Sequence, residues 1–299
     1  MPVVSIIIPT YGEPVFLEQS INSVISQTFS DWELIVVDDN PPESVHRTQT
    51  ESLMAKYKNK DNIFYLKHPK NLNGAAARNT GLAKACGEYV AFLDSDDEYF
   101  PDRLERCLNA MQGTDSTVAG VFTGCEFRRG GKVYHIEKNI NTQNCLRETL
   151  ACKFVFCTGS NIFVRKSVLD ELSGFDESFI RHQDYEFLVR LFEHYSLLAL
   201  QEVLVIKNNE NVNLPNVERM IKVKELFLSK YERIIKTFSS KEQQYIYQSH
   251  YLQIAEAAIK SKDHLIAKEY YQKAKATGSV QLKSRARIIA LNIKGKIQG

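Results

Sequence analysis

Carboxylate side chains gather at three points of this sequence, and the densest group is Asp94-Ser95-Asp96-Asp97, directly after the apolar run Tyr89–Leu93. Three carboxylates within four residues repel one another strongly unless a cation lies among them. Oxygen ligands suit Mg²⁺ or Mn²⁺, which bind one or two protein carboxylates together with substrate phosphates. Alone, such a motif is more often an acidic turn that caps the next helix. Its position after an apolar strand favours the cation site.

The second group, Asp38-Asp39, ends another apolar run, Glu33–Val37. A carboxylate placed there can accept hydrogen bonds from a base N–H or from ribose hydroxyls, as in dinucleotide-binding folds. The alternative is an Asx turn into Asn40-Pro41-Pro42, and the residues alone favour neither. Tyr11, after Pro9-Thr10, either stacks on a base or lies at the rim of a site.

The third group contains Asp184, at the start of a segment whose apolar residues recur at helical spacing. An Asp in a first helical turn is ordinarily a cap or a dipole partner. A positioned carboxylate is also the usual general base for a hydroxyl, and we expect His182 to be its neighbour rather than the base. Arg78 lies among small residues, Ala75–Asn79, where a guanidinium suits a phosphate or forms a salt bridge to the Asp cluster.

The elements that must position these groups are short apolar strands that alternate with helical patterns across residues 1–112. The expected strands are Val3–Ile8, Glu33–Val37, Ile63–Leu66 and Tyr89–Leu93. The expected helices are one with Leu17, Ile21, Val24 and Thr28 on its apolar face and one over Ala75–Ala85. This alternation predicts an α/β fold with a parallel sheet, in which the polar residues at the carboxyl ends of the strands meet at one edge.

The rest of the chain is less regular and then becomes helical. Gly130-Gly131 before Lys132–Ile136 predicts a hairpin. A capping box of Ser240 and Gln243 and a cap at Asp263 predict two helices that resemble a tetratricopeptide unit. We expect a catalytic domain over residues 1–212, with a nucleotide-binding half (1–112) and an acceptor half (113–212), and a helical region over residues 213–299.

Composition excludes several classes of protein. A net charge of +2 and a pI near 8.1 do not indicate nucleic-acid binding. The six cysteines include no C-x-x-C pair and are typical of reduced thiols in the cytoplasm. The amino-terminal apolar run lacks a basic region and is too short to span a bilayer, so we expect neither a signal peptide nor a transmembrane helix.

Basic residues flank an apolar stripe at the carboxyl end, so that segment either lies on the inner face of a membrane or packs as a solvated helix. The tyrosine-rich helices before it could also form a homo-oligomer interface. The stripe comprises Leu282, Ala286, Ile289 and Ile293, with Lys283, Arg285, Arg287, Lys294 and Lys296 beside it.

Taken together, the motifs resemble the inverting GT-A glycosyltransferases of family 2, of the bacterial type, over about residues 3–210. The fold that this implies is Rossmann-like, with a mixed, mainly parallel sheet between helices. The matching segments are Val4–Tyr11, Ser23–Thr28, Glu33–Asp39, Ala76–Gly81, Gly87–Asp97, Gly174–Glu177 and Asp184–Glu186, in that order.

The resemblance also implies roles for individual residues. Asp39 would bind the base, most often uracil, and Arg78 would lie near the diphosphate. Asp94 and Asp96 would form the D-x-D motif, with Asp96 the direct ligand of Mn²⁺ or Mg²⁺, and Asp184 would be the general base. The remaining donor-site positions are Pro9, Thr10, Tyr11, Glu13, Asn71 and Ser95, and those of the acceptor and donor-sugar pocket are Thr158, Gly159, Ser160 and His182.

Three positions depart from the family pattern. Asn40-Pro41-Pro42 stands where the family usually has Gly-Ser, so the loop under the base should differ. Asn73 stands at a usual glycine, although asparagine tolerates a left-handed backbone better than most residues. The stretch Val203–Asn209 carries Lys207 as its only cation, where many members have an Arg or His for the diphosphate.

The implied activity is transfer of a sugar from a nucleotide sugar, expected to be a UDP-sugar, to an acceptor hydroxyl with inversion. The acceptor would be a glycan, lipid-linked or protein-linked, in cell-surface polysaccharide or glycan synthesis. A dinucleotide oxidoreductase or a phosphate-loop ATPase would need G-x-G-x-x-G or G-x-x-x-x-G-K, and the chain contains neither. A sugar-nucleotide pyrophosphorylase and a non-catalytic sugar-binding protein are the alternatives that stay open.

Overall fold

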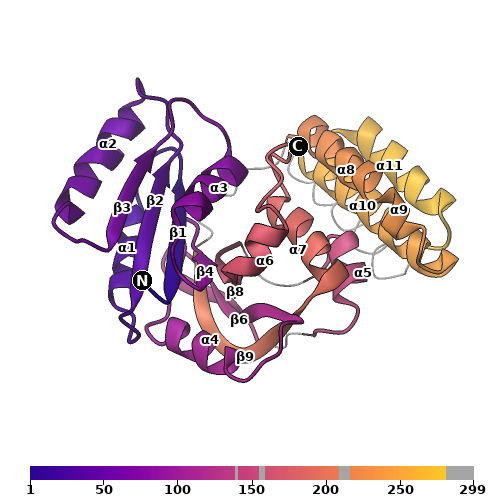
Figure 1. Cartoon of the computed structure of the whole chain (residues 1–299). Coiled ribbons are helices and arrows are strands. Elements are labelled where there is room, and N and C mark those ends of the chain that lie inside the picture. The colour runs from indigo at the N-terminus through magenta and orange to yellow at the C-terminus, as the bar shows by residue number, and fades with distance from the viewer. Residues whose placement is uncertain (139–140, 155–158, 209–215, 281–299) are drawn as a thin grey trace. The chain divides into compact units, whose positions relative to one another are not determined.

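The strands predicted for the first hundred residues form one parallel array. The protein is described by a computed structural model that covers residues 1–138, 141–154, 159–208 and 216–280. In it β1 (Val4–Thr10) pairs with β2 (Trp32–Asp38) on one side and with β4 (Tyr89–Phe92) on the other, and β2 pairs with β3 (Ile63–Lys67) (Figure 1). Each predicted strand is confirmed, with its ends moved by at most two residues.

The register of these strands places their polar ends together. Thr10 lies opposite Asp38, and Ile7 lies opposite Phe92, so all the carboxyl ends reach the same edge of the sheet. The backbone N–H of Asp39 donates to the carbonyl of Thr10 at 2.9 Å, which extends the pairing one step past β2. The acidic groups after β2 and β4 therefore share one edge, as the alternation of strands and helices predicts.

Helices cover both faces of this array. One face packs Ile6, Ile8 and Leu34 against α1 (Leu17–Ile25), α2 (Val45–Met54) and α4 (Arg103–Met111). α3 (Gly74–Lys84) lies on the other face, where a Cβ at Gly81 would be 2.4 Å from Cγ2 of Ile7. Glycine is therefore required there for close packing. α2 was not predicted, because its sequence is mostly polar.

The second half of this sheet is mixed. In order along the sheet, the described strands are β3-β2-β1-β4-β8-β6-β9-β5, and the predicted hairpin strand β7 pairs with β6. β4–β8, β8–β6 and β5–β9 are antiparallel, whereas β6–β9 is parallel. The elements are β5 (Glu98–Tyr99), β6 (Val118–Arg129), β7 (Lys132–Glu137), β8 (Phe163–Arg165), β9 (Ser196–Asn208), α6 (Lys166–Glu171) and α7 (Gln183–His194), with 3₁₀ turns at Ala55–Tyr57 and Gly159–Asn161.

The chain divides into two units, and the sheet belongs to the first, residues 1–143 with 155–210. The second unit, residues 144–154 with 211–299, is helical within its described part. Among the described helices of both units, none is long and apolar enough to cross a membrane. The described helices of the second unit are α5 (Cys145–Leu150), α8 (Val217–Lys230), α9 (Glu232–Ile235), α10 (Ser240–Lys260) and α11 (His264–Ala276).

The predicted helix pair of the second unit forms, with one correction at its start. The capping box of α10 uses Ser239 and Glu242, one residue before the predicted Ser240 and Gln243. Ser239 has the extended backbone that a cap needs, whereas Ser240 is already helical. Asp263 caps α11 by accepting from the N–H of Ile266, as predicted. The basic and apolar stripe of residues 282–296 lies outside the described residues.

Candidate active site

The acidic turn after β4 is organised by its most buried member, Asp97. Its carboxylate accepts from the Ser160 hydroxyl at 2.6 Å and from the Asn208 N–H at 3.2 Å, and Lys207 Nζ lies 3.5 Å away. Burial raises the pKa of Asp97 to about 7, although Lys207 opposes this effect. Asp97 is therefore an internal anchor of the turn. Lys207, which stands in the stretch where many family members have an Arg or His for the diphosphate, is held by this anchor.

Asp94 and Asp96 differ from Asp97 in what surrounds them. Asp94 forms an ion pair with Arg78 at 2.6 Å, and its backbone N–H donates to the Ser160 hydroxyl. Asp96 is half-buried, and no other described residue forms a hydrogen bond or ion pair with its carboxylate. Burial raises the pKa of Asp96, and the nearby charge of Asp94 adds to this effect. Within the described part of the chain, Asp96 is thus the carboxylate of this turn that is left available for a ligand.

This donor set fits a divalent cation that is bound together with substrate phosphates. Among the described residues, no three His, Cys, Asp or Glu side chains are arranged to enclose a metal ion. Mg²⁺ and Mn²⁺ sites of phosphate-transferring enzymes commonly use only one or two carboxylates and take their other ligands from substrate and water. Asp96, with Asp94 beside it, meets that requirement.

Arg78 joins this turn to the start of α7. Its Nη1 donates to Oε1 of Gln183 at 2.9 Å and to the Gly74 carbonyl at 3.2 Å, while Nη2 pairs with Asp94. The guanidinium also lies over the ring of Phe175, 5.6 Å from its centre. Both terminal nitrogens of the guanidinium are therefore fixed.

Asp184 follows Gln183 in the first turn of α7 and is half-buried. Burial raises the pKa of its carboxyl, whereas the positive charge of Arg78 lowers it. His182 precedes the helix with a left-handed backbone, and its ring packs edge-on against Tyr185. Asp184 is thus a partly shielded carboxylate on the helix that Arg78 ties to the acidic turn.

Gly159 and Ser160, predicted to line the sugar pocket, lie beside Asp94 of the acidic turn. A Cβ on Gly159 would be 3.5 Å from Arg78 Nη2 and 3.7 Å from Asp94 Oδ1. The buried Arg103 donates to the carbonyl of Ser160 and holds this turn from below. Thr158 lies outside the described residues.

At the end of β2, the chain's own donors surround both carboxylates. Asp38 is fully buried, forms an ion pair with Arg47 at 3.0 Å and accepts from the Tyr65 hydroxyl at 2.5 Å. Asp39 accepts four hydrogen bonds, which come from the His68 ring, the Asn71 amide and the backbone N–H groups of Leu72 and Asn73.

These four bonds occupy the four lone-pair positions of the Asp39 carboxylate. A base N–H would therefore have to replace one of them. Asn71 is exposed, and it is the exposed residue of the set that bonds through its side chain. At the end of β1 and in the loop after it, Thr10 is buried, whereas Tyr11 is 64 % exposed and Glu13 is exposed. Pro9 and Ser95 are half-buried.

Two departures from the family pattern have clear structural consequences. Asn40 accepts from the N–H of Gly12 at 2.8 Å and so ties the loop after β1 to the end of β2. Asn73 adopts φ 87° and ψ 167°, a region that residues other than glycine rarely enter. Its side chain caps α3 by accepting from the N–H groups of Ala75 and Ala76.

Two polar residues of this site were not predicted. One is Gln183, which accepts a hydrogen bond from Arg78. Its position next to Asp184 in the sequence was the signal that could have identified it. His68 comes directly after β3, so the rule that ligands collect at strand ends would have found it. Its side chain is buried against Asp39 and Thr80.

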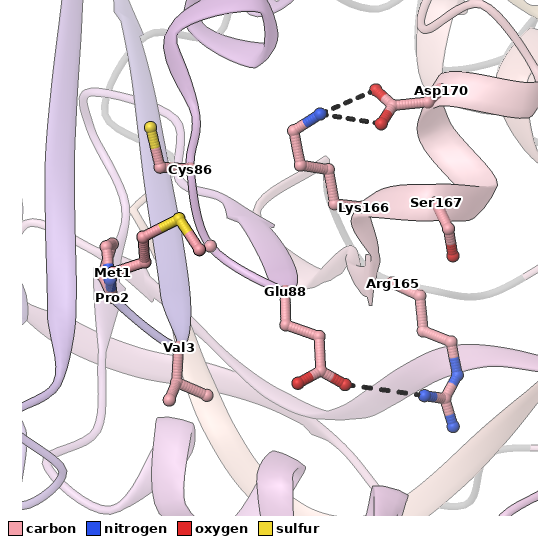
Figure 2. A pocket seen from close by; sticks show the side chains of 10 residues that line it. Met1, Pro2, Val3, Cys86, Glu88, Arg165, Lys166, Ser167 and Asp170 are labelled. Carbon is pink, nitrogen blue, oxygen red and sulfur yellow. Dashed lines mark hydrogen bonds and ion pairs between the residues drawn. The ribbon is translucent and has the colours of Figure 1, made fainter.

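A pocket of about 510 Å³ lies at the opposite edge of the sheet (Figure 2). Its lining includes Val3 and Glu88, which precede β1 and β4, and Arg165, which pairs with Tyr89 at the amino end of β4. Figure 2 shows Lys166 bonded to Asp170 and Arg165 paired with Glu88. This pocket contains none of the predicted site residues.

Comparison with known proteins identifies the family of this chain. The model of "Glycosyl transferase family 2" matches residues 5–173, more than half of the chain. The chain belongs to glycosyl transferase family 2. This confirms the predicted family and the predicted enzyme class, glycosyltransferase.

Individual relatives of this chain are also named as glycosyltransferases. An uncharacterized glycosyltransferase of Methanocaldococcus jannaschii, MJ1057, is 31 % identical over 228 residues, which cover 70 % of this chain and 73 % of the relative. The putative teichuronic acid biosynthesis glycosyltransferase TuaG of Bacillus subtilis is 32 % identical over 155 residues. That match covers 50 % of this chain and 59 % of TuaG.

Solved structures with low sequence identity share the fold. S. aureus TarS in complex with UDP has a TM-score of 0.56 and 17 % identity, with 100 % of this chain and 91 % of that chain covered. The mannosyltransferase PcManGT of Pyrobaculum calidifontis, in complex with GDP-Man and Mn²⁺, has a TM-score of 0.57 and 17 % identity, with 99 % and 88 % covered. The predicted GT-A fold is confirmed, and the roles of single residues stay predictions.

Proposed function

We propose that this glycosyltransferase moves a sugar from a UDP-sugar to an acceptor hydroxyl by one inverting displacement, with Asp184 as the general base. The contact of Arg78 with both Asp94 and Gln183 carries the proposal. Through it, the D-x-D carboxylates after β4 and the candidate base on α7 belong to one site.

The choice of donor and cation is supported by the neighbours of this fold. TarS was solved with UDP and PcManGT with Mn²⁺. TuaG is named for the biosynthesis of teichuronic acid, a polysaccharide, which supports a role in cell-surface polysaccharide or glycan synthesis. We propose a lipid-linked or protein-linked glycan as acceptor and action on the cytoplasmic side of the membrane.

In the proposed reaction, the acceptor oxygen bonds to the anomeric carbon while the bond from that carbon to the diphosphate oxygen breaks. Asp184 takes the hydroxyl proton, for which a carboxylate that is ionised yet partly shielded is suited. Asp96 and Asp94 would hold Mn²⁺ or Mg²⁺, which supplies Lewis-acid stabilisation of the leaving nucleoside diphosphate. Arg78 holds Asp94 in place through its ion pair.

The direct test of this proposal is the variant Asp184→Asn, assayed with UDP-, GDP- and dTDP-sugars by release of the nucleoside diphosphate. We expect turnover to fall by about 10²–10⁴-fold, the usual contribution of a positioned base. UDP binding in the presence of Mn²⁺, measured by calorimetry, should stay unchanged. The control is Asp170→Asn, at the pocket on the opposite edge of the sheet.

Two results would contradict parts of this proposal. Wild-type turnover in Asp184→Asn would remove Asp184 as the base. A wild-type enzyme that uses GDP- or dTDP-sugars but no UDP-sugar would overturn the proposed donor and leave the base assignment intact.

A further inference from the structure

A buried histidine links the two halves of the proposed donor site. His68 is only 5 % exposed, and both of its ring nitrogens have partners. Nδ1 lies 2.7 Å from Oδ1 of Asp39, and Nε2 lies 2.8 Å from the hydroxyl oxygen of Thr80. The backbone of His68 is also fixed, because Arg47 Nη2 donates to its carbonyl at 2.8 Å.

The chemistry of Asp39 sets the direction of the first of these bonds. An ionised carboxylate only accepts, so Nδ1 of His68 carries a hydrogen and donates to Asp39. In the neutral ring, Nε2 then accepts the hydroxyl hydrogen of Thr80. The result is an ordered row of polar groups, from Thr80 through His68 to Asp39.

Each end of this row holds a different part of the site. Asp39 accepts from Asn71, Leu72 and Asn73, so it fixes the loop between β3 and α3. Thr80 lies on α3, two residues after Arg78, which contacts the acidic turn. His68 is the side chain that bonds to both ends.

We propose that His68 is a positioning residue for donor binding, which sets the position of Asp39, at the end of β2, relative to Arg78 on α3. The inference rests on the proposed function, in which the nucleoside end of the donor lies at the loop and the diphosphate end lies at Arg78. One bound donor must meet both ends at once, so a change in their spacing weakens binding before it affects the bond-breaking step.

Four single variants of the full chain separate the two contacts. His68→Asn keeps a donor near Nδ1 but cannot reach Thr80, whereas His68→Gln reaches Thr80 but leaves Asp39 without its ring donor. Thr80→Val removes the hydroxyl at nearly constant shape, and Thr80→Ser keeps it as the matched control. The measurements are kcat and KM for the UDP-sugar that the wild type uses, Kd for UDP with Mn²⁺, and thermal melting.

We expect KM and the UDP Kd to rise about tenfold in His68→Gln and about threefold in His68→Asn and Thr80→Val, since bonds to charged groups are the stronger ones. Throughout, kcat should stay near the wild-type value, and Thr80→Ser should behave as wild type. His68→Asn combined with Thr80→Val should be no worse than His68→Asn alone, because both remove the same contact.

The inference is overturned if folded His68→Gln and His68→Asn bind UDP as the wild type does, or if kcat falls while KM stays constant. It is also overturned if Thr80→Ser is as impaired as Thr80→Val. A wild type that turns over no nucleotide sugar would instead contradict the proposed function, so the two failures are distinguishable.

Discussion

Two acidic groups lie at the same edge of the sheet, the closed pair Asp38-Asp39 after β2 and the group Asp94–Asp97 after β4, and they differ in whether every carboxylate has a partner among the described residues. Asp38 and Asp39, after β2, are almost completely buried and surrounded by donors from the chain itself. Asp96, after β4, is half-buried and has no bonding partner among the other described side chains. An acidic cluster at a strand end is therefore not a binding site by itself. The number of internal donors decides what it can bind.

The position of each strand explains the difference. β2 lies between β1 and β3. The segment after β3 supplies His68 and the loop of residues 71–73, and α2, which follows β2 itself, supplies Arg47. β4 borders the mixed half of the sheet, where the donors Ser160, Lys207 and Asn208 are taken by Asp97. Arg78 then pairs with Asp94, and Asp96 is left for a ligand.

The largest expected effect concerns Asp96, the carboxylate of the group after β4 that has no partner among the other described residues. Asp96→Asn should lower turnover by about a hundredfold or more, because Lewis-acid stabilisation is worth several kcal/mol and each 1.36 kcal/mol is about tenfold in rate. The melting temperature without added metal should not fall, since the variant removes a charge that burial disfavours. Turnover over a Mn²⁺ titration and a thermal melt in EDTA measure both quantities. Full activity at low Mn²⁺ would show that Asp96 is not the cation's ligand.

The closed pair should respond in stability instead. Asp38→Asn leaves Arg47 buried without its counter-charge, and breaking such a pair costs about 3–5 kcal/mol of unfolding free energy. Denaturant unfolding gives this value. The matched control is Glu18→Gln, whose surface pair with Lys56 should be worth no more than about 1 kcal/mol. If both variants lost the same unfolding free energy, the buried ion pair of Asp38 would contribute no more to stability than a surface pair.

The sequence predicts that the acidic groups lie at one edge of the sheet, but it does not predict which carboxylates are bonded within the chain. Alternating apolar runs and helical patterns were enough to place Asp39, Asp94 and Asp96 together, since parallel strands end on the same side. Which carboxylate receives hydrogen bonds from the chain depends on residues that are far away in the sequence. Ser160 reaches Asp97 across 63 positions and Gln183 reaches Arg78 across 105, and no local spacing encodes such contacts.

Local polarity also misled the prediction of elements. α2 has few apolar residues, yet it forms because Ser44 caps its start and the buried Arg47 attaches it to the end of β2. The start of α10 was predicted one residue late because Ser239 and Ser240 are adjacent, each with a suitable acceptor three residues on. Backbone conformation, rather than residue type, selects between them.

The carboxyl group of Asp184 should set the pH dependence of the reaction. Asp184 must be ionised to accept a proton, so kcat/KM should fall as the pH drops through its pKa, which burial holds above the ordinary value of 3.8. Arg78→Gln removes the charge that lowers this pKa, so the acid limb should move to higher pH. Profiles of log(kcat/KM) at saturating Mn²⁺ locate the limb. A limb that stays in place in Arg78→Gln would mean that another group controls it.

The smallest expected effect lies in the loop that Asp39 closes. Asn73 has a backbone that costs a non-glycine residue about 1–3 kcal/mol. Glycine in its place loses only a few tenths of a kcal/mol of helix capping. It also loses the bond from Nδ2 to the Glu177 carbonyl and has a more flexible unfolded chain. Asn73→Gly should therefore stabilise the fold by up to about 1 kcal/mol.

Asn73→Ala is the matched comparison, because alanine keeps the backbone strain of Asn73 and removes its cap. Denaturant unfolding should then rank glycine above asparagine and asparagine above alanine. Asparagine ranking first would mean that its cap and its bond to Glu177 outweigh the strain. In that case the loop of residues 71–73 would be held by the side chains of both Asp39 and Asn73. The closed pair would then be part of a larger group of internal hydrogen bonds that includes Asn73.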